Sequence, residues 1–443
     1  MNTPIADFVR NYAYDENTRF HMPGHKGNAF VGCEAYDITE VKGADALYEA
    51  EGIIDESEKI AKHLFGTGRT VYSTEGSTQC IKAMLHLALT YKSRSGRPYV
   101  VAARNAHKAF LYAVALLDLD VVWIYPTEMS SICSCSISAG QIEEVLNKQD
   151  EMPIAVYLTS PDYLGGMVDI ESIAKVCHDY GTLLAVDNAH GAYLHFLNQS
   201  LHPMDWGVDM CSDSAHKTLP VLTGGAYLHI GENAPEYLKE NAKSAMALYG
   251  STSPSYLTLM SMDMCNYYLA EGYREALQAT VANVKNTKDV LESNGWHVME
   301  SEPLKIVIKS PKVATGEGIA NMLRRKQIEC EYADKEYVVF MVTPENSYDD
   351  LEKLVEALGE NHLGKSADNM YVPVRGRREM SVRCAMFSHQ EKIAIEDAKG
   401  RICASPTVGC PPAIPIVVSG EVIDDDAIRL FEYYGIKDVF VVS

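Results

Sequence analysis

The sequence predicts an α/β fold built on a mainly parallel sheet. From about residue 55 to residue 230, segments with the apolar spacing of a helix alternate with short runs rich in Val, Ile and Tyr. That alternation is typical of an open sheet with helices on both faces. Polar residues also follow several of the strand candidates, at the edge where such sheets place their ligand sites. Finally, a chain of 443 residues has room for a second domain.

The elements follow in order along the chain. Helical spacing marks residues 56–66, 76–92, 107–117 and 170–181. Strand candidates are residues 70–74, 98–103, 121–125, 154–160, 183–187 and 225–230. A long helical pattern around 254–292 leads to further strand candidates at 304–310 and 336–342, a helix at 348–360 and a polar loop near 360–370. We therefore expect an N-terminal segment over 1–30, a large domain over 31–285 and a smaller α+β domain over 286–443.

Composition and charge exclude several classes of protein. The net charge of −21 has the wrong sign for a nucleic-acid-binding surface and suits a cationic small molecule better. The first 20 residues lack the apolar core of a signal peptide, and no run is long and apolar enough to span a membrane. The eleven cysteines are scattered, as expected for reduced thiols in the cytoplasm. Cys133 and Cys135 form a CxC pair without a second ligand pair, so we expect no zinc site there.

One lysine stands out by its surroundings. Lys217 lies among small and hydroxyl-bearing residues in the segment SDSAHKTLP, residues 212–220. Lysine is a poor nucleophile while it is protonated, so a lysine in a confined, hydroxyl-rich turn favours a Schiff base with an aldehyde cofactor. The alternative is an ordinary solvated lysine, and the neighbouring motifs decide between the two.

The lysine segment resembles the SxHKTL motif of the ornithine/lysine/arginine decarboxylases, which use pyridoxal phosphate (PLP). Other segments extend this resemblance over nearly the whole chain. They are MPGHKG (22–27), RNAHK (104–108), TSPDYLG (159–165), STSPSY (251–256), GRI (400–402) and CPPAIP (410–415). The resemblance implies the aspartate-aminotransferase fold (PLP fold type I) for the large domain. It is to a short form, because the receiver-like N-terminal domain of the large inducible enzymes has no counterpart here.

Cofactor contacts have candidates on the strand ends. Gly76, Ser77 and Thr78 follow a strand and open a helix, and their backbone amides and hydroxyls suit a phosphate dianion. A simple Ser/Thr helix cap is the common alternative. Asp187 ends the apolar strand LLAVD, where a carboxylate is costly unless it is paired. Paired with the pyridine nitrogen of PLP, it would keep that nitrogen protonated.

The resemblance supplies the remaining candidates. It implies that His107 stacks on the cofactor ring, although a surface or capping histidine is the alternative. His190 belongs to the same cofactor-binding segment as Asp187, and a metal site formed by these two side chains lacks further ligands. Ser214 and His216 correspond to the family's phosphate-contacting and lysine-orienting pair. Thr252 corresponds to a residue that enters the active site of the partner subunit.

Three positions depart from the family's pattern. Asn188 stands where an acidic residue is common, Asp162 replaces threonine, and Ala413 replaces a glycine, which puts the geometry of one turn in doubt. None of these changes alters the expected class of enzyme.

The expected activity is PLP-dependent decarboxylation of lysine, arginine or ornithine to an amine that feeds polyamine-type metabolism. Lys217, His216, Asp187 and His107 are the expected catalytic residues, in a homodimer or larger homo-oligomer that binds no metal, nucleic acid or membrane. An aminotransferase or a lyase on the same fold remains an alternative, as does a PLP-fold binding protein without activity. A nucleotide-binding module is disfavoured because no GxGxxG or P-loop motif follows a strand.

Overall fold

The computed structural model describes residues 1–15, 17–92, 96–126, 131–366, 374–406 and 412–443. The chain forms two compact units, each made of segments that are distant in sequence. The first comprises Met1–Ser93 and Ile170–Ala276, and the second comprises Arg94–Asp169 and Leu277–Ser443. Among the described residues, no helix has the length and apolar character needed to cross a bilayer.

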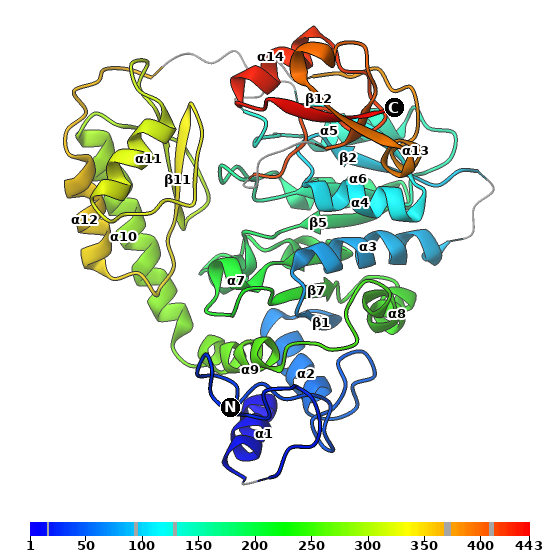
Figure 1. The fold of residues 1–443 in the computed structure, drawn as a ribbon, viewed down its shortest axis with the longest axis vertical. Coiled ribbons are helices and arrows are strands. Elements are labelled where there is room, and N and C mark those ends of the chain that lie inside the picture. Colours follow the sequence, from blue (N-terminus) through cyan, green and yellow to red (C-terminus); the bar gives the residue numbers. More distant parts are fainter. Residues whose placement is uncertain (16, 93–95, 127–130, 367–373, 407–411) are drawn as a thin grey trace. The chain divides into compact units, whose positions relative to one another are not determined.

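Among its described residues, the first unit contributes neighbouring strands in the order β1-β7-β6-β5, of which β1, β7 and β5 are labelled in Figure 1. These strands are β1 (Arg69–Ser73), β5 (Leu183–Asp187), β6 (Met210–Asp213) and β7 (Ala226–Ile230). β5 and β6 run parallel, whereas β7 is antiparallel to both of its neighbours. Its helices are α1 (Pro4–Tyr14), α2 (Ile53–Phe65), α3 (Ser77–Tyr91), α6 (Ile170–Asp179), α7 (Ala215–Thr218), α8 (Glu236–Ala247) and α9 (Tyr256–Ala270). Two 3-10 turns, η1 (Ala192–Phe196) and η2 (Pro203–Trp206), connect β5 to β6.

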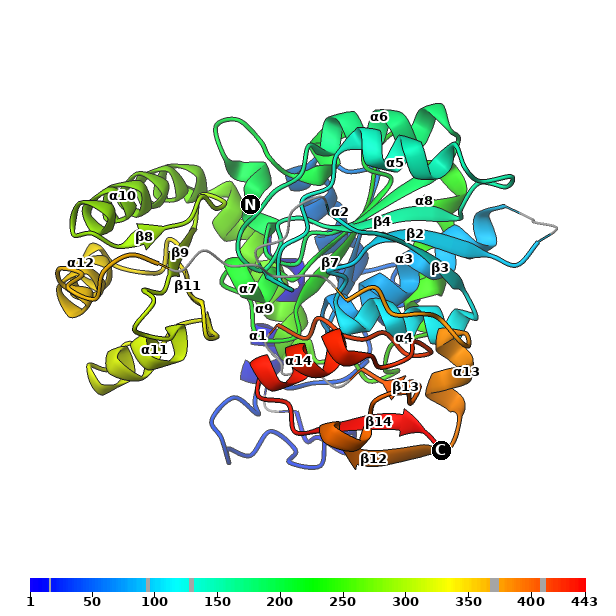
Figure 2. The same cartoon turned by 90° about the horizontal axis from the view of Figure 1, so that it is seen from above.

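These strands are sequences of mostly apolar residues because both of their faces are buried. Every residue of β5, β6 and β7 is buried. α3 packs against β1, β5, β6 and β7, while α6 packs against β5, and Figure 2 shows these two helices on opposite sides of the strands. A strand covered on both faces needs apolar side chains in both directions, so period-two alternation is absent.

The long helical pattern around 254–292 forms two helices, α9 and α10 (Tyr273–Ser293), in place of one. The break falls at Gly272, whose φ of +86° lies in the left-handed region that ends helices. Apolar residues at helical spacing occur on both sides of this residue, so the spacing alone does not reveal where one helix ends and the next begins.

The described residues of the second unit contribute strands to three sheets, one of which is the seven-stranded sheet that also contains the strands of the first unit. Figure 1 shows strands of this unit. Parallel strands β4 (Ala155–Thr159), β2 (Tyr99–Ala103) and β3 (Asp120–Ile124) lie side by side, accompanied by α4 (Lys108–Leu117) and α5 (Ala139–Leu146). An antiparallel sheet has the order β10 (Tyr332–Ala333), β11 (Tyr337–Met341), β9 (Lys305–Lys309) and β8 (His297–Val298), with helices α11 (Gly316–Arg325) and α12 (Tyr348–Leu358). A three-stranded sheet has the order β12 (Gln390–Ala394), β14 (Asp438–Val442) and β13 (Cys403–Ser405), with α13 (Val382–Phe387), η3 (Ile395–Asp397) and α14 (Asp425–Tyr433).

The predicted fold class is confirmed: parallel strand pairs alternate with helices, and a smaller antiparallel sheet with its own helices lies near the C-terminus. The domain boundaries at residues 30 and 285 stay predictions. Of the predicted polar loop, residues 360–366 are described and include the exposed His362 and Lys365, whereas 367–370 lie outside the described residues. Cys410 and Pro411 of the C-terminal motif also lie outside them.

Candidate functional site

The candidate site of the first unit lies where β5 and β6 end. The two strands are parallel, and Asp187 at the end of β5 is the register partner of Ser212 in β6. The carboxyl ends of both strands therefore lie at one edge of the sheet, which is the usual place for a ligand site in an open α/β sheet. β6 leads directly through Ser214 into the short helix α7, which carries His216 and Lys217.

Lys217 is brought to the turn that follows β5. Its Nζ lies 3.0 Å from Nε2 of His190, a residue with 5% exposure. Helix α7 is short because Leu219, which precedes Pro220, has extended backbone angles. Lys217 thus lies on a one-turn helix with its amine within hydrogen-bonding distance of an imidazole nitrogen.

Asp187 is almost completely buried, with 3% exposure. Its Oδ1 accepts hydrogen bonds from Ser212 Oγ at 3.4 Å and from the backbone N–H of Ala189 at 3.2 Å. A carboxylate buried at the end of a strand is a suitable partner for a cation, and a protonated ring nitrogen is such a cation. The donor set at this position therefore fits the pyridinium of PLP.

The start of α3 fits a phosphate group. Gly76 precedes the helix with a φ of +73°, and no side chain caps the helix there. A Cβ built on Gly76 would meet nothing within 4 Å, so the space before the helix is open. Ser77 Oγ lies 2.9 Å from Ser214 Oγ, and the half-buried Thr78 shares the first turn. Because Gly76 has no side chain to satisfy the first amides, this terminus suits an anion better than a simple Ser/Thr cap would.

His216 has a defined tautomer. Its Nδ1 lies 2.9 Å from the carbonyl oxygen of Gly225, so Nδ1 carries the proton and donates it. Burial lowers the pKa of His216, and the nearby Lys217 lowers it further. The ring is therefore neutral near pH 7, with Nε2 as its basic atom.

Two further predicted site residues, His107 and Thr252, lie on other segments of the chain. His107 belongs to the second unit and is the N-cap of α4, where its Nδ1 accepts a hydrogen bond from the N–H of Ala109 at 3.1 Å. This is the capping role that the sequence left open, and the stacking role stays a prediction. Thr252 lies in an exposed segment before α9.

Sequence reasoning overlooked a buried cluster beside the site. Among the described residues, His202, Cys211 and Asp213 form the one group with donor atoms close enough to hold a metal ion, and all three are buried. Neither Asp187 nor His190 belongs to it. The signal available in the sequence was Asp213 itself, a charged residue ending an apolar strand.

Cys133 and Cys135 are buried free thiols of the second unit. Burial raises the pKa of Cys135 to about 11 and that of Cys133 further. Both therefore stay protonated near pH 7, in which state a thiol is a poor metal ligand.

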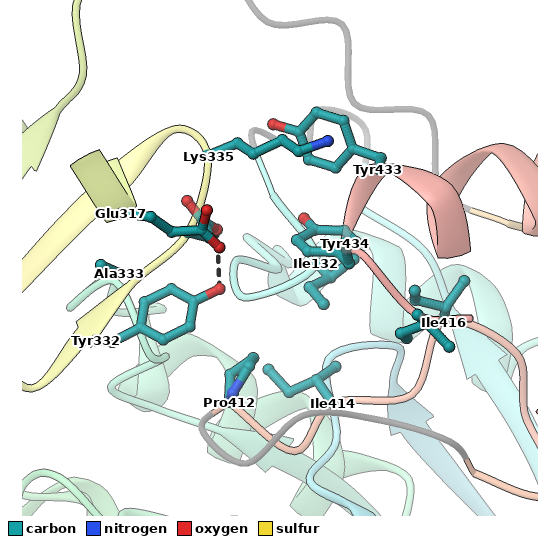
Figure 3. Close-up of a pocket in the computed structure, with 12 residues that line it drawn as sticks. Ile132, Glu317, Tyr332, Ala333, Lys335, Pro412, Ile414, Ile416, Tyr433 and Tyr434 are labelled. Atoms are coloured by element: carbon teal, nitrogen blue, oxygen red, sulfur yellow. Dashed lines mark hydrogen bonds between the residues drawn. The ribbon is translucent and has the colours of Figure 1, made fainter. Parts of the chain in front are cut away.

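A separate cavity of about 160 Å³ lies within the second unit (Figure 3). Tyr332, Tyr433 and Tyr434 contribute to its walls, together with isoleucines from three segments. Its polar groups contact one another, since Tyr332 donates to Asp334 at 2.8 Å and the Lys335 ammonium lies 4.6 Å from the centre of the Tyr433 ring. None of the predicted site residues lines this cavity.

Comparison with known families identifies two matching sequence models. A sequence model described as the Orn/Lys/Arg decarboxylase major domain matches residues 3–350, and one for the C-terminal domain of the same family matches residues 373–440. The chain is similar to an arginine decarboxylase of Bacillus subtilis, with 28% identity over 96% of this chain and 92% of the relative. It is similar as well to an arginine decarboxylase of Halalkalibacterium halodurans, with 27% identity over 96% of this chain and 91% of the relative.

Solved structures show the same fold. A lysine decarboxylase of Francisella novicida matches with a TM-score of 0.82 at 16% identity, over 100% of this chain and 81% of that one. A serine palmitoyltransferase of Sphingomonas wittichii matches with a TM-score of 0.57 at 14% identity, over 80% of this chain and 82% of that one. At these identities the likeness concerns the fold and not the reaction.

Proposed function

Because the chain belongs to the Orn/Lys/Arg decarboxylase family and is a PLP-dependent amino-acid decarboxylase, we propose that it converts a basic amino acid to the corresponding amine and CO2. The observation that carries the proposal is Lys217 Nζ at 3.0 Å from His190 Nε2, on a turn that adjoins the strand ending at Asp187. We further propose that the amine feeds polyamine-type metabolism.

The cofactor contacts follow from the residues present. Lys217 would hold the aldehyde carbon, Asp187 the ring nitrogen, and Gly76, Ser77 and Ser214 the phosphate. When bound, PLP supplies an electron sink for the pair left on Cα as CO2 departs. Asp187 would keep the ring nitrogen protonated, and the positive charge would strengthen the electron-withdrawing effect of the ring.

The protein must also return a proton to Cα, and Lys217 suits this role better than His216. His216 donates its Nδ1 proton to Gly225, and burial lowers its pKa, so Nε2 is rarely protonated near pH 7. Lys217 Nζ lies within hydrogen-bonding distance of His190 Nε2, which provides a partner for proton exchange. We therefore assign the proton donor to Lys217 and an orienting role to His216.

We propose that arginine is the preferred substrate. Support comes from relatives of similar length that bear the name arginine decarboxylase. Purified protein with added PLP should release CO2 from arginine, lysine or ornithine, with the highest kcat/KM for arginine. Formation of a keto acid without CO2 would contradict the decarboxylase assignment, and a higher kcat/KM for lysine or ornithine would overturn the choice of substrate.

We also propose that the active site is completed across a two-fold interface, with Thr252 entering the partner's site and His107 stacking on the ring. The exposure of residues 251–253 supports this, because a residue that serves another subunit must reach the surface. Mixing inactive Lys217→Ala subunits with inactive Thr252 variants should restore activity in hybrid dimers. Hybrid dimers that form but stay inactive would contradict the shared site.

Two further proposals concern place and organisation. We propose a cytoplasmic location, supported by the ten described cysteines, all of which are free thiols. We also retain the boundaries near residues 30 and 285 for the N-terminal segment, the cofactor-binding domain and the small domain. Limited proteolysis with mapped cleavage sites would test these boundaries.

A further inference from the structure

We propose that Asp213 is a positioning residue of this decarboxylase, whose buried carboxylate holds the turn after Asp187 in place beside the helix that carries Lys217. The inference rests on the proposed roles of Asp187 and Lys217. It adds a residue that touches neither cofactor nor substrate and acts through those that do.

Asp213 is fully buried, and its carboxylate is surrounded by donors from separate segments. Oδ1 accepts from Asn188 Nδ2 at 2.7 Å and from the Cys211 thiol at 3.4 Å. Oδ2 accepts from His202 Nε2 at 2.8 Å and lies 3.3 Å from His229 Nε2. Removing a carboxylate from water is costly, and only such a complete set of partners offsets the cost.

The charge stays on Asp213 near neutral pH. Burial by itself would raise the pKa of this carboxyl, but His202 and His229 hold it well below its ordinary value. His202 Nδ1 accepts from the N–H of Met204, so its Nε2 carries a proton and donates to Asp213. The arrangement is therefore an anion held by preformed donors.

The hydrogen bond to Asn188 transmits this anchoring to the site. Asn188 directly follows Asp187, and its backbone N–H donates to the carbonyl of Ser212 at 3.0 Å. Its own carbonyl accepts from the N–H of Gly191 at 2.8 Å, and a Cβ on Gly191 would lie 2.0 Å from Asn188 Oδ1. The turn between Asp187 and Gly191, which contains His190, is thus fixed by backbone bonds on one side and by Asp213 on the other.

Asp213 is connected to the lysine helix through the backbone. It immediately precedes Ser214, which is the first residue before the helix of Lys217 and which forms a hydrogen bond with Ser77. One carboxylate therefore joins the ends of β5 and β6. Releasing it should loosen the turn that presents Asp187 and His190 without removing any group that contacts the cofactor.

The test compares two buried carboxylates of the same unit. In protein without cofactor, Asp213→Asn should speed hydrogen exchange of the amides of residues 188–191 at least tenfold. In the PLP-loaded enzyme, kcat should fall at least tenfold while KM changes less than twofold. Asp263→Asn is the matched control, because Asp263 is also fully buried and bonds to Ser57 and Ala6. It should lower the melting temperature without changing kcat or exchange at 188–191.

Asn188→Ala gives a second route if Asp213→Asn fails to fold, because it removes only the link to the turn and should produce the same exchange and kcat changes. Unchanged exchange at 188–191 in the foldable variants, or equal losses in Asp263→Asn, would overturn the inference. Stoichiometric zinc in the purified protein, lost in His202→Ala, would replace it with a metal site. If wild-type protein released no CO2 from any basic amino acid, the proposed function would fail, while the exchange experiment would still decide the role of Asp213.

Discussion

Two buried aspartates, one in each unit, have pKa values that are shifted in opposite directions. Burial opposes the ionisation of Asp213, which ends β6 in the first unit, but His202 and His229 hold its pKa below the ordinary value. Asp162 in the second unit follows β4, and its Oδ1 accepts from the backbone N–H groups of Leu164 and Gly166 at 2.9 and 2.8 Å. Burial nevertheless raises the pKa of Asp162 to about 6.

The difference shows what keeps a buried charge charged. Backbone amides shape the loop around Asp162 but do not offset the loss of water, whereas the imidazole groups at Asp213 do. At the end of β6 the first unit keeps the Asp213 carboxylate ionised, and the side chains of Lys217 and His190 lie nearby. The loop after β4 uses its carboxylate mainly to hold the backbone. The following substitutions test this contrast.

Lys217→Ala should have the largest effect, because it removes the one side chain expected to bond with the cofactor. We expect activity to fall by several orders of magnitude, with little change in melting temperature of the protein without cofactor. After borohydride reduction of the wild type, mass spectrometry should find the pyridoxyl group on the peptide bearing Lys217. Lys175→Ala, at an 80% exposed position of α6, is the control and should retain full activity. A pyridoxyl group on Lys26 or Lys108 would contradict the assignment.

Asp187→Asn should come next. The isosteric amide keeps the shape of the site but not the charge that holds the ring nitrogen protonated, so we expect cofactor binding to persist while kcat falls roughly a hundredfold or more. Steady-state kinetics at saturating PLP measures this. A kcat near that of the wild type would show that decarboxylation does not require a negative charge at the end of β5. The difference in charge between the buried aspartates of the two units would then be unrelated to activity.

Gly76→Ala should have a smaller effect, directed at cofactor affinity. Its φ of +73° makes a Cβ strained by about 1–2 kcal/mol, and the methyl group would occupy the open space before α3. Gly181→Ala is a matched control, because Gly181 has a φ of +64° and nothing within 4 Å of a built Cβ. Both variants should lose stability, but only Gly76→Ala should raise the Kd for PLP, as measured by titration of the protein without cofactor. An equal Kd in both would remove the phosphate site from the start of α3.

Asp162→Asn should have the smallest effect, confined to the pH dependence of stability. The pKa of Asp162 rises from 3.8 to about 6 on folding, so the native state binds the proton more tightly. Its stabilising contribution is complete below pH 3.8 and is lost as the pH rises to about 6, by up to roughly 3 kcal/mol. Urea unfolding between pH 4 and 6.5 should show a flatter profile in the variant. An unchanged slope would mean that Asp162 is already ionised at pH 4.

Local features of the chain were open to prediction from the sequence. The helix expected over 76–92 is α3 (Ser77–Tyr91), and the strand expected over 183–187 is β5 (Leu183–Asp187). Both follow from the spacing of apolar residues, which depends on neighbours a few positions away. The lysine segment could also be identified from the sequence, because the residues of its motif are consecutive.

Tertiary structure alone decided which side chains meet. Lys217 and His190 are 27 positions apart, and no periodicity links them. Asp213 finds its partners in His202 and His229, two of 14 histidines that the sequence does not distinguish. Hydrogen bonds and charge interactions act over a few ångströms in space, whatever the separation along the chain. The sequence therefore determined which groups were available for chemistry, and the folding of β5, β6 and β7 into one sheet determined which of them carry charge and which hold others in place.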